Sequence, residues 1–155
     1  MSKETMSKEK TSFVYVTYIR STPQKVFEAI TKPDLARRYW GHENVSDWRP
    51  GSKWEHIRAN DKRTVQLVGK VVEVSPPTRL VITWANASQA SDPASYSRVT
   101  FEIEEYENMV RLTVTHDELE ADSGMANGIK KGWPVVLSSL KSFLETGRGL
   151  DVFAK

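Results

Sequence analysis

The segment 132–147 near the C-terminus constrains the fold of this chain more than any other stretch. Its large apolar residues recur at steps of three and four, which draws one stripe along an α-helix. These residues are Trp133, Val136, Leu137, Leu140, Phe143 and Leu144. Polar residues, Ser138 and Ser139 among them, occupy the positions between and predict a solvent-facing side. Because a one-sided helix must pack on a broad apolar surface, the rest of the chain is expected to supply that surface.

Two residues bear on where this helix begins and ends. Gly147 is expected to cap its C-terminus, because glycine adopts the left-handed conformation at little cost. Pro134 is tolerated in a first turn, where its missing N–H is not needed, and it would then mark the start. Helical turns that extend back toward Met125 would instead make Pro134 a kink, and the sequence leaves both alternatives open.

The preceding segments predict an antiparallel sheet. Residues 11–20 have the β-branched and aromatic composition of a strand, and Thr22-Pro23 then predicts the capped start of a helix. Two short helices are expected, at Pro23–Thr31 and Pro33–Tyr39. Six further strands are expected from their period of two, at Asn44–Trp48, Lys53–Arg58, Val65–Val74, Leu80–Ala85, Arg98–Tyr106 and Met109–Asp117. Short turn-forming breaks between most of these strands imply antiparallel neighbours.

Two longer connections complete the prediction, a loop at Ala87–Ser97 and a polar link at Ala121–Gly128. The order of elements predicts an α+β fold, in which the last helix packs across one face of a single sheet. Residues 11–150 are expected to form one domain. Residues 1–10 are predicted to be a disordered tail and residues 151–155 a C-terminal tail.

Composition argues against several classes of function. The 22 basic and 20 acidic residues give a net charge of +2, too balanced to indicate a nucleic-acid partner. The absence of cysteine excludes disulfides, thiolate catalysis and cysteine-ligated zinc. No apolar run approaches the ~20 residues of a membrane span, and no signal peptide is recognisable. The expected location is the cytoplasm. No nucleophile motif, phosphate loop or dinucleotide fingerprint occurs, so no catalytic residue and no cofactor are predicted.

Aromatic side chains are concentrated on the predicted inward faces of the strands and on the helix stripe. A largely apolar pocket with a few polar groups is the usual make-up of a small-ligand site. The candidate ligand-binding residues are Tyr39, Trp40, Trp54, His56, Trp84, Phe101, His116, Trp133, Val136, Leu137 and Leu140. The competing interpretation is that these residues only fill a core.

His56 and His116 are the polar exceptions on these inward faces. Each could orient a ligand or act as an acid or base near neutral pH. The alternative is a structural histidine whose ring nitrogens are both hydrogen-bonded. The third histidine, His42, is expected in a loop, and no spacing typical of metal ligands occurs, so no metal site is predicted.

Four motifs in a fixed order resemble one known superfamily. They are STPQKVFEAITKPDL at 21–35, PGSKW at 50–54, GKVVEVSPPTRLVITW at 69–84 and GWPVVLSSL at 132–140. They are similar to the START-like (SRPBCC, helix-grip) superfamily, and within it to the small bacterial single-domain branch named for the activator of the heat-shock protein 90 ATPase. The resemblance implies a strongly curved antiparallel sheet of six to seven strands that grips the C-terminal helix, with a cavity between them.

Three functions are compatible with these features. The leading hypothesis is a non-enzymatic protein that holds a small hydrophobic or aromatic molecule in the cavity. The family name implies a second, a protein-interaction module for a chaperone in a stress response, acting as a monomer or a homodimer. The third is a cyclase- or aromatase-like enzyme with a cavity histidine as acid–base, although no acid–base pair is recognisable.

Overall fold

The protein is built on one seven-stranded antiparallel sheet, in a computed structural model that describes residues 9–60 and 62–153. The strands are β1 Lys10–Ile19, β2 His42–Ser46, β3 Lys53–Arg58, β4 Val65–Ser75, β5 Arg79–Asn86, β6 Ser97–Tyr106 and β7 Met109–Glu120. Their order across the sheet is β1-β7-β6-β5-β4-β3-β2, so β2 to β7 form a meander and β1 joins its far edge. The predicted α+β fold with a sheet of six to seven strands is confirmed.

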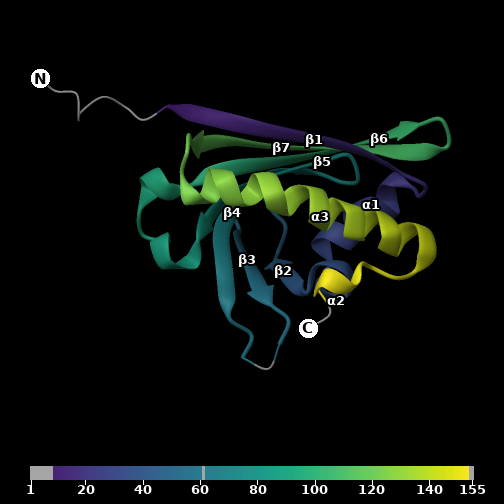
Figure 1. The fold of residues 1–155 in the computed structure, drawn as a ribbon, viewed down its shortest axis with the longest axis horizontal. Helices are drawn as coiled ribbons and strands as arrows, with labels where there is room; N and C mark the ends of the chain where they lie inside the picture. The colour runs from purple at the N-terminus through teal and green to yellow at the C-terminus, as the bar shows by residue number, and fades with distance from the viewer. Residues whose placement is uncertain (1–8, 61, 154–155) are drawn as a thin grey trace, which may run out of the picture.

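Three α-helices pack on this sheet. They are α1 Pro23–Thr31, α2 Pro33–Trp40 and α3 Gly124–Thr146, and short 3-10 turns occur at η2 Ala87–Gln89, η3 Pro93–Ser95 and η4 Asp151–Phe153. Figure 1 shows α3 running along one face of the sheet, with α1 and α2 beside its C-terminal half. None of the helices within the described residues combines the length and the apolar character required to cross a membrane.

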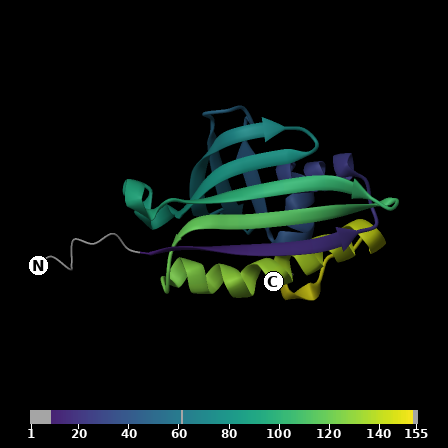
Figure 2. The ribbon, with the colours of Figure 1, turned by 90° about the horizontal axis from the view of Figure 1, so that it is seen from above.

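The sheet bends strongly between its two halves. In Figures 1 and 2, β2, β3 and β4 turn away from the long strands β1, β6 and β7, and the helices lie on the concave side. Gly69 in β4 lies so close to β5 that a Cβ atom would overlap the carbonyl group of Thr83. The register with β5 also shifts between Val71 and Glu73. A glycine and a register shift of this kind allow a strand to bend sharply.

The last helix is longer than its apolar stripe. It begins at Gly124, and the Ser123 side chain caps it by accepting a hydrogen bond from the Ala126 amide at 3.0 Å. Pro134 therefore lies inside the helix, so the alternative in which it starts the helix is wrong, and the predicted connection at 121–128 is too long. The predicted cap at Gly147 is confirmed by its φ of 89° and by its amide bond to the Phe143 carbonyl.

One position on this helix was predicted on the wrong face. Ser139 is fully buried, and not on a solvent-facing side. Its hydroxyl donates to the Tyr39 carbonyl at 2.6 Å and accepts from the Leu150 amide at 2.9 Å. The helix is therefore covered by the sheet on one side and by α2 and the segment after Gly147 on another, which makes its buried surface wider than one stripe.

The other predicted elements agree closely with the structure. Two strands differ most: β2 begins at His42, two residues earlier than predicted, and β7 continues to Glu120. His42 is therefore in a strand and not in a loop. Of the predicted N-terminal tail, residues 1–8 lie outside the described residues and Lys10 begins β1. Of the predicted C-terminal tail, η4 covers Asp151–Phe153 and residues 154–155 lie outside the described residues.

Candidate functional site

The residues predicted to bind a ligand are buried together between the sheet and the helices. None of the eleven is more than 7% exposed. Their aromatic rings form a continuous group, which we call the aromatic cluster: Trp40, Trp54, His56, Trp84, Phe101, His116 and Trp133. Trp84 lies near its centre, with ring centroids 5.2 Å from Trp54 and 5.4 Å from Trp133. The fold brings these residues together, and their role in binding a ligand stays a prediction.

The open cavity expected between the sheet and α3 is not found within this cluster. One enclosed space beside the cluster has no room for a water molecule, and no residue of α3 lines it. It is lined by Ile30, Trp40, Asn44, Trp48, Trp54, Leu80, Ile82, Trp84 and Phe101. The bulky indole rings fill this space. The expected ligand-binding cavity between the sheet and the C-terminal helix stays a prediction.

Two hydrogen-bond donors in the cluster have no acceptor. The indole nitrogens of Trp54 and Trp84 are buried, and neither finds a partner in the part of the chain that the structure describes. A buried donor left unpaired costs about 1–3 kcal/mol of stability. Both residues line the same filled space, and their two unpaired donors make this part of the cluster energetically unfavourable for the protein alone.

Trp48 completes the wall of this space and was not among the predicted site residues. Among the lining residues it is the only one that is not buried. Its φ is 55°, in the left-handed region that a bulky residue rarely adopts. Its indole N–H donates to the Thr31 carbonyl at 3.1 Å, and its amide N–H donates to the Ser46 hydroxyl at 3.0 Å. The other four tryptophans of the chain were all predicted site residues. Trp48 was predicted only as the last residue of a strand, which gave no sign that it lines this space.

His116 has a partner on each ring nitrogen. The Trp133 indole donates to Nδ1 at 3.0 Å, so the proton of the neutral ring is on Nε2, which lies 2.7 Å from the Ser97 hydroxyl. Ser97 donates in turn to the Trp84 carbonyl at 3.1 Å. Burial lowers the pKa of His116 to about 4, which keeps the ring neutral. This arrangement matches the structural alternative and leaves no free nitrogen for acid–base chemistry in this conformation.

His56 has a partner on only one nitrogen. Asn44 donates through its amide to the Ile30 carbonyl at 2.8 Å, so its oxygen is the acceptor for His56 Nδ1–H at 2.7 Å. The other nitrogen, Nε2, has no hydrogen bond to any described residue. Burial, together with the nearby His42, lowers the pKa of His56 well below its usual value. The Nε2 atom is therefore an unprotonated acceptor.

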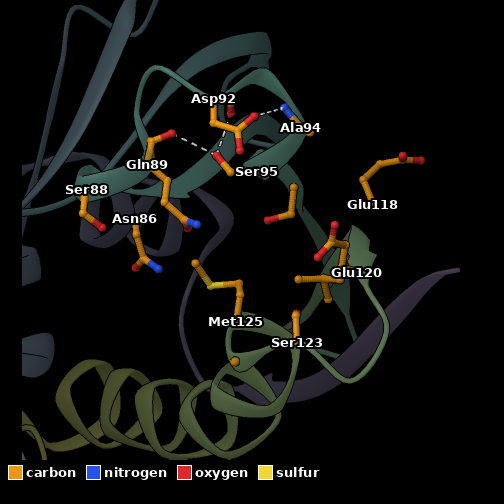
Figure 3. A pocket seen from close by; sticks show the side chains of 13 residues that line it. Asn86, Ser88, Gln89, Asp92, Ala94, Ser95, Glu118, Glu120, Ser123 and Met125 are labelled. Atoms are coloured by element: carbon orange, nitrogen blue, oxygen red, sulfur yellow. Dashed lines mark hydrogen bonds between the residues drawn. The ribbon is translucent and has the colours of Figure 1, made fainter. Parts of the chain in front are cut away.

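Two open grooves lie beside the cluster. The larger, with a volume of about 620 Å³, lies between the η2–η3 loop and the start of α3. In Figure 3, Met125 and Ser123 face Asn86 and Gln89 across this groove, while Glu118 and Glu120 border another side. Its lining is mostly polar and acidic, and only the fold brings residues 86–97 next to residues 118–125. Neither groove was predicted from the sequence.

The second groove has a volume of about 470 Å³ and is called here the His56 groove. It is lined by His42, His56, Val65, Gln66, Leu67, Asn86, Ala87 and Ser88. Asn86 and Ser88 border both grooves, so the chain at 86–88 separates them. Across residues 9–60 and 62–153, no three side chains of the metal-ligating types converge as a metal site requires.

Comparison with known proteins supports a family assignment. Residues 20–145 match the sequence profile of the family described as activator of Hsp90 ATPase homolog 1-like protein. No curated protein matches the chain. Among solved structures, protein MLL2253 from Mesorhizobium loti is 28% identical with a TM-score of 0.72, over 87% of this chain and 97% of that chain.

Two further structures share the fold at lower identity. The Aha1 dimer from Colwellia psychrerythraea is 23% identical with a TM-score of 0.74, over 90% of this chain and 99% of that chain. PFC0360w, an HSP90 activator from Plasmodium falciparum, is 23% identical with a TM-score of 0.64, over 79% of this chain and 86% of that chain. These similarities confirm the predicted helix-grip fold. Since the profile match extends over most of its length, the chain belongs to the family of activator of Hsp90 ATPase homolog 1-like proteins.

Proposed function

We propose that the protein binds a small, mainly apolar aromatic molecule within the aromatic cluster, at the space between Trp54, Trp84 and Trp48. The observation that carries this proposal is the pair of buried indole N–H groups without an acceptor on Trp54 and Trp84. A molecule with a carbonyl or ether oxygen would supply the missing acceptor. Its aromatic body would bury apolar surface against the surrounding rings, which is worth about 25 cal/mol per Å².

The energetic reason for this assignment is the asymmetry of buried hydrogen bonds. Each unpaired donor destabilises the free protein by about 1–3 kcal/mol, and an acceptor from a ligand removes that cost on binding. A purely structural core gains nothing from an unpaired donor at these positions. The proposed ligand class is therefore an aromatic molecule with at least one neutral oxygen acceptor.

Binding requires part of the wall to move, since the space beside Trp54 and Trp84 has no room for a water molecule. Trp48 is the side chain that can move at the lowest cost. It is the one half-buried member of the wall, and a single side-chain hydrogen bond to Thr31 holds its ring. We therefore place the entrance at the loop between β2 and β3.

The test compares two probes of similar size. Acetophenone has a carbonyl acceptor, and ethylbenzene does not. We expect the wild-type protein to bind acetophenone about tenfold more tightly, equal to about 1.4 kcal/mol, measured by thermal shift and calorimetry. Trp54→Phe should lose this preference. Trp133→Phe is the matched control, because its indole N–H already has an acceptor in His116.

Equal affinity of wild type for the two probes would contradict the proposal. So would the absence of stabilisation by both at high concentration, because a ligand at one hundred times its dissociation constant stabilises by about 2.7 kcal/mol. Either result would mean that the unpaired indole donors lower the stability of the protein without serving to bind a ligand.

Family membership favours a second candidate, a chaperone-interaction module. One structural relative is described as an HSP90 activator and another as an Aha1 dimer. The test is retention of the purified bacterial Hsp90-type chaperone on the immobilised protein, together with the ATPase rate of that chaperone. No retention at micromolar concentration and no change in rate would count against this candidate, and sedimentation analysis would separate monomer from homodimer. A cytoplasmic location would suit either function and stays a prediction.

A further inference from the structure

The His56 groove is bordered by an acceptor atom of a buried side chain that the aromatic cluster does not use. His56 is 3% exposed, and its Nδ1–H is committed to Asn44. Its Nε2 atom has no partner among the described residues, and the side chain lines a groove of about 470 Å³. The atom is not among the buried unpaired side-chain atoms of the described residues, so it is open to the groove, where a donor from outside the protein can reach it.

The direction of this acceptor is fixed by the surrounding rings. The His42 ring stacks on the His56 ring with centroids 4.4 Å apart and an angle of 5° between the planes. Trp40 contacts the same ring with centroids 4.5 Å apart. Since Asn44 also holds Nδ1, the imidazole cannot rotate freely. A polar group that is held in one orientation by packing and hydrogen bonds is the arrangement that a specific binding site needs.

The other walls of the groove define the chemistry of a ligand. Val65, Leu67 and Ala87 form an apolar part of the lining. The exposed side chains of Asn86 and Ser88 have no hydrogen bond to any described residue, and both can donate or accept. Among the described residues that line the groove there is no aspartate, glutamate, lysine or arginine. The site therefore suits an uncharged molecule with a donor and an acceptor close together.

We propose that the His56 groove is a binding site for small neutral cyclic amides. In this site the amide N–H donates to His56 Nε2, and the carbonyl oxygen accepts from Asn86 or Ser88. The ring of the ligand lies against Val65, Leu67 and Ala87. This site is separate from the one proposed between Trp54 and Trp84, and it does not depend on that proposal.

The experiment uses 2-pyrrolidinone and its N-methyl derivative, which lacks only the N–H donor. The chain has 3 histidines, so long-range proton–nitrogen NMR spectra of the full-length protein resolve each ring. We expect 2-pyrrolidinone to shift the His56 Nε2 resonance saturably, with a dissociation constant of about 1 mM for so small a molecule. The N-methyl derivative should leave this resonance unchanged. His116 is an internal control, because both of its nitrogens already have partners.

Two exposed positions complete the test without risk to the core. Asn86→Ala and Ser88→Ala together should weaken 2-pyrrolidinone binding about tenfold, because they remove the partners of the carbonyl. Thermal melting checks that this double variant remains folded. The proposal is overturned by any one of three results: no saturable shift of His56 Nε2, equal shifts with both probes, or unchanged affinity in the double variant.

Discussion

His116 and His56 are both buried on the inner face of one sheet, but their surroundings differ. His116 on β7 has a partner on each ring nitrogen, and the Trp133 donor and the Ser97 hydroxyl beside it are also satisfied. His56 on β3 has one partner and one free nitrogen. Next to it, the Trp54 indole has no acceptor among the described residues, and neither has the indole of Trp84, which lies between the two histidines.

The difference between the two regions teaches that burial alone does not separate structural residues from binding residues. A fully paired network stabilises and rigidifies a core, whereas an incompletely paired one lowers stability unless something else completes it. Natural sequences that depart from complete pairing do so most often at functional sites. The His116 side is therefore interpreted as the structural half of the cluster, and the Trp54–His56 side as the half available for binding.

Replacing His116 should have the largest effect. His116→Ala removes a buried ring and leaves the Trp133 donor unpaired, so we expect the free energy of unfolding to fall by about 3–5 kcal/mol in urea titrations. His56→Ala is the matched change and should cost about 1–2 kcal/mol less, since it breaks one hydrogen bond and not two. Equal losses at the two positions would remove the proposed distinction between the regions.

Two tryptophan substitutions compare the same change in both regions. Trp133→Phe breaks the hydrogen bond to His116, whereas Trp54→Phe removes a donor that was unpaired. We expect Trp133→Phe to lower the free energy of unfolding by about 2 kcal/mol more than Trp54→Phe does. Chemical denaturation of the two variants under identical conditions measures the difference. If Trp54→Phe proved the more damaging, the Trp54 indole would have an unrecognised partner.

Acidification should destabilise the protein through its neutral histidines. The pKa of His116 is about 4 in the folded protein, against about 6.5 in an unfolded chain. Below pH 6.5 the unfolded state binds the proton more readily than the folded state does. The stability that comes from keeping His116 neutral is therefore complete above pH 6.5 and declines toward pH 4. We expect a loss of about 2 kcal/mol by pH 5 from His116, and His56 adds a loss in the same direction.

The measurement is urea unfolding at intervals between pH 7 and pH 5. Over this range most carboxylates stay ionised, so the histidines dominate the change. His116→Phe is the control and should show a shallower dependence on pH. A dependence as steep as that of wild type would mean that His116 does not contribute.

Opening the wall at Trp48 should have the smallest effect on stability. Trp48→Ala removes a half-buried ring with one side-chain hydrogen bond, and we expect a loss of about 1 kcal/mol. The indole N–H groups of Trp54 and Trp84 should then exchange with solvent several times faster by NMR. The Trp133 N–H, in the other region, should exchange as in wild type. Unchanged exchange at all three would place the entrance elsewhere.

Local patterns in the sequence predicted most of the fold. Strands with a period of two, and a helix with a period near 3.6, follow from which side chains must face the core. Thr22 and Gly147 act at the helix ends as expected, because capping depends on a few adjacent residues. The same alternation correctly placed Trp54, His56, Trp84 and His116 on inward faces.

What the sequence by itself determined was which side chains point inward, because that depends on the local period of the chain. Only the tertiary structure decided which of them are paired, since His116 depends on Trp133 and Ser97 from two other elements. The same holds for Ser139, whose buried partners come from α2 and from the segment after Gly147. The filled space beside Trp54 and Trp84, the place of Trp48 in its wall and the free nitrogen of His56 also depend on distances between segments that are remote along the chain. The partner of a buried polar group often comes from a distant part of the sequence, so a local pattern does not predict whether the group is hydrogen-bonded.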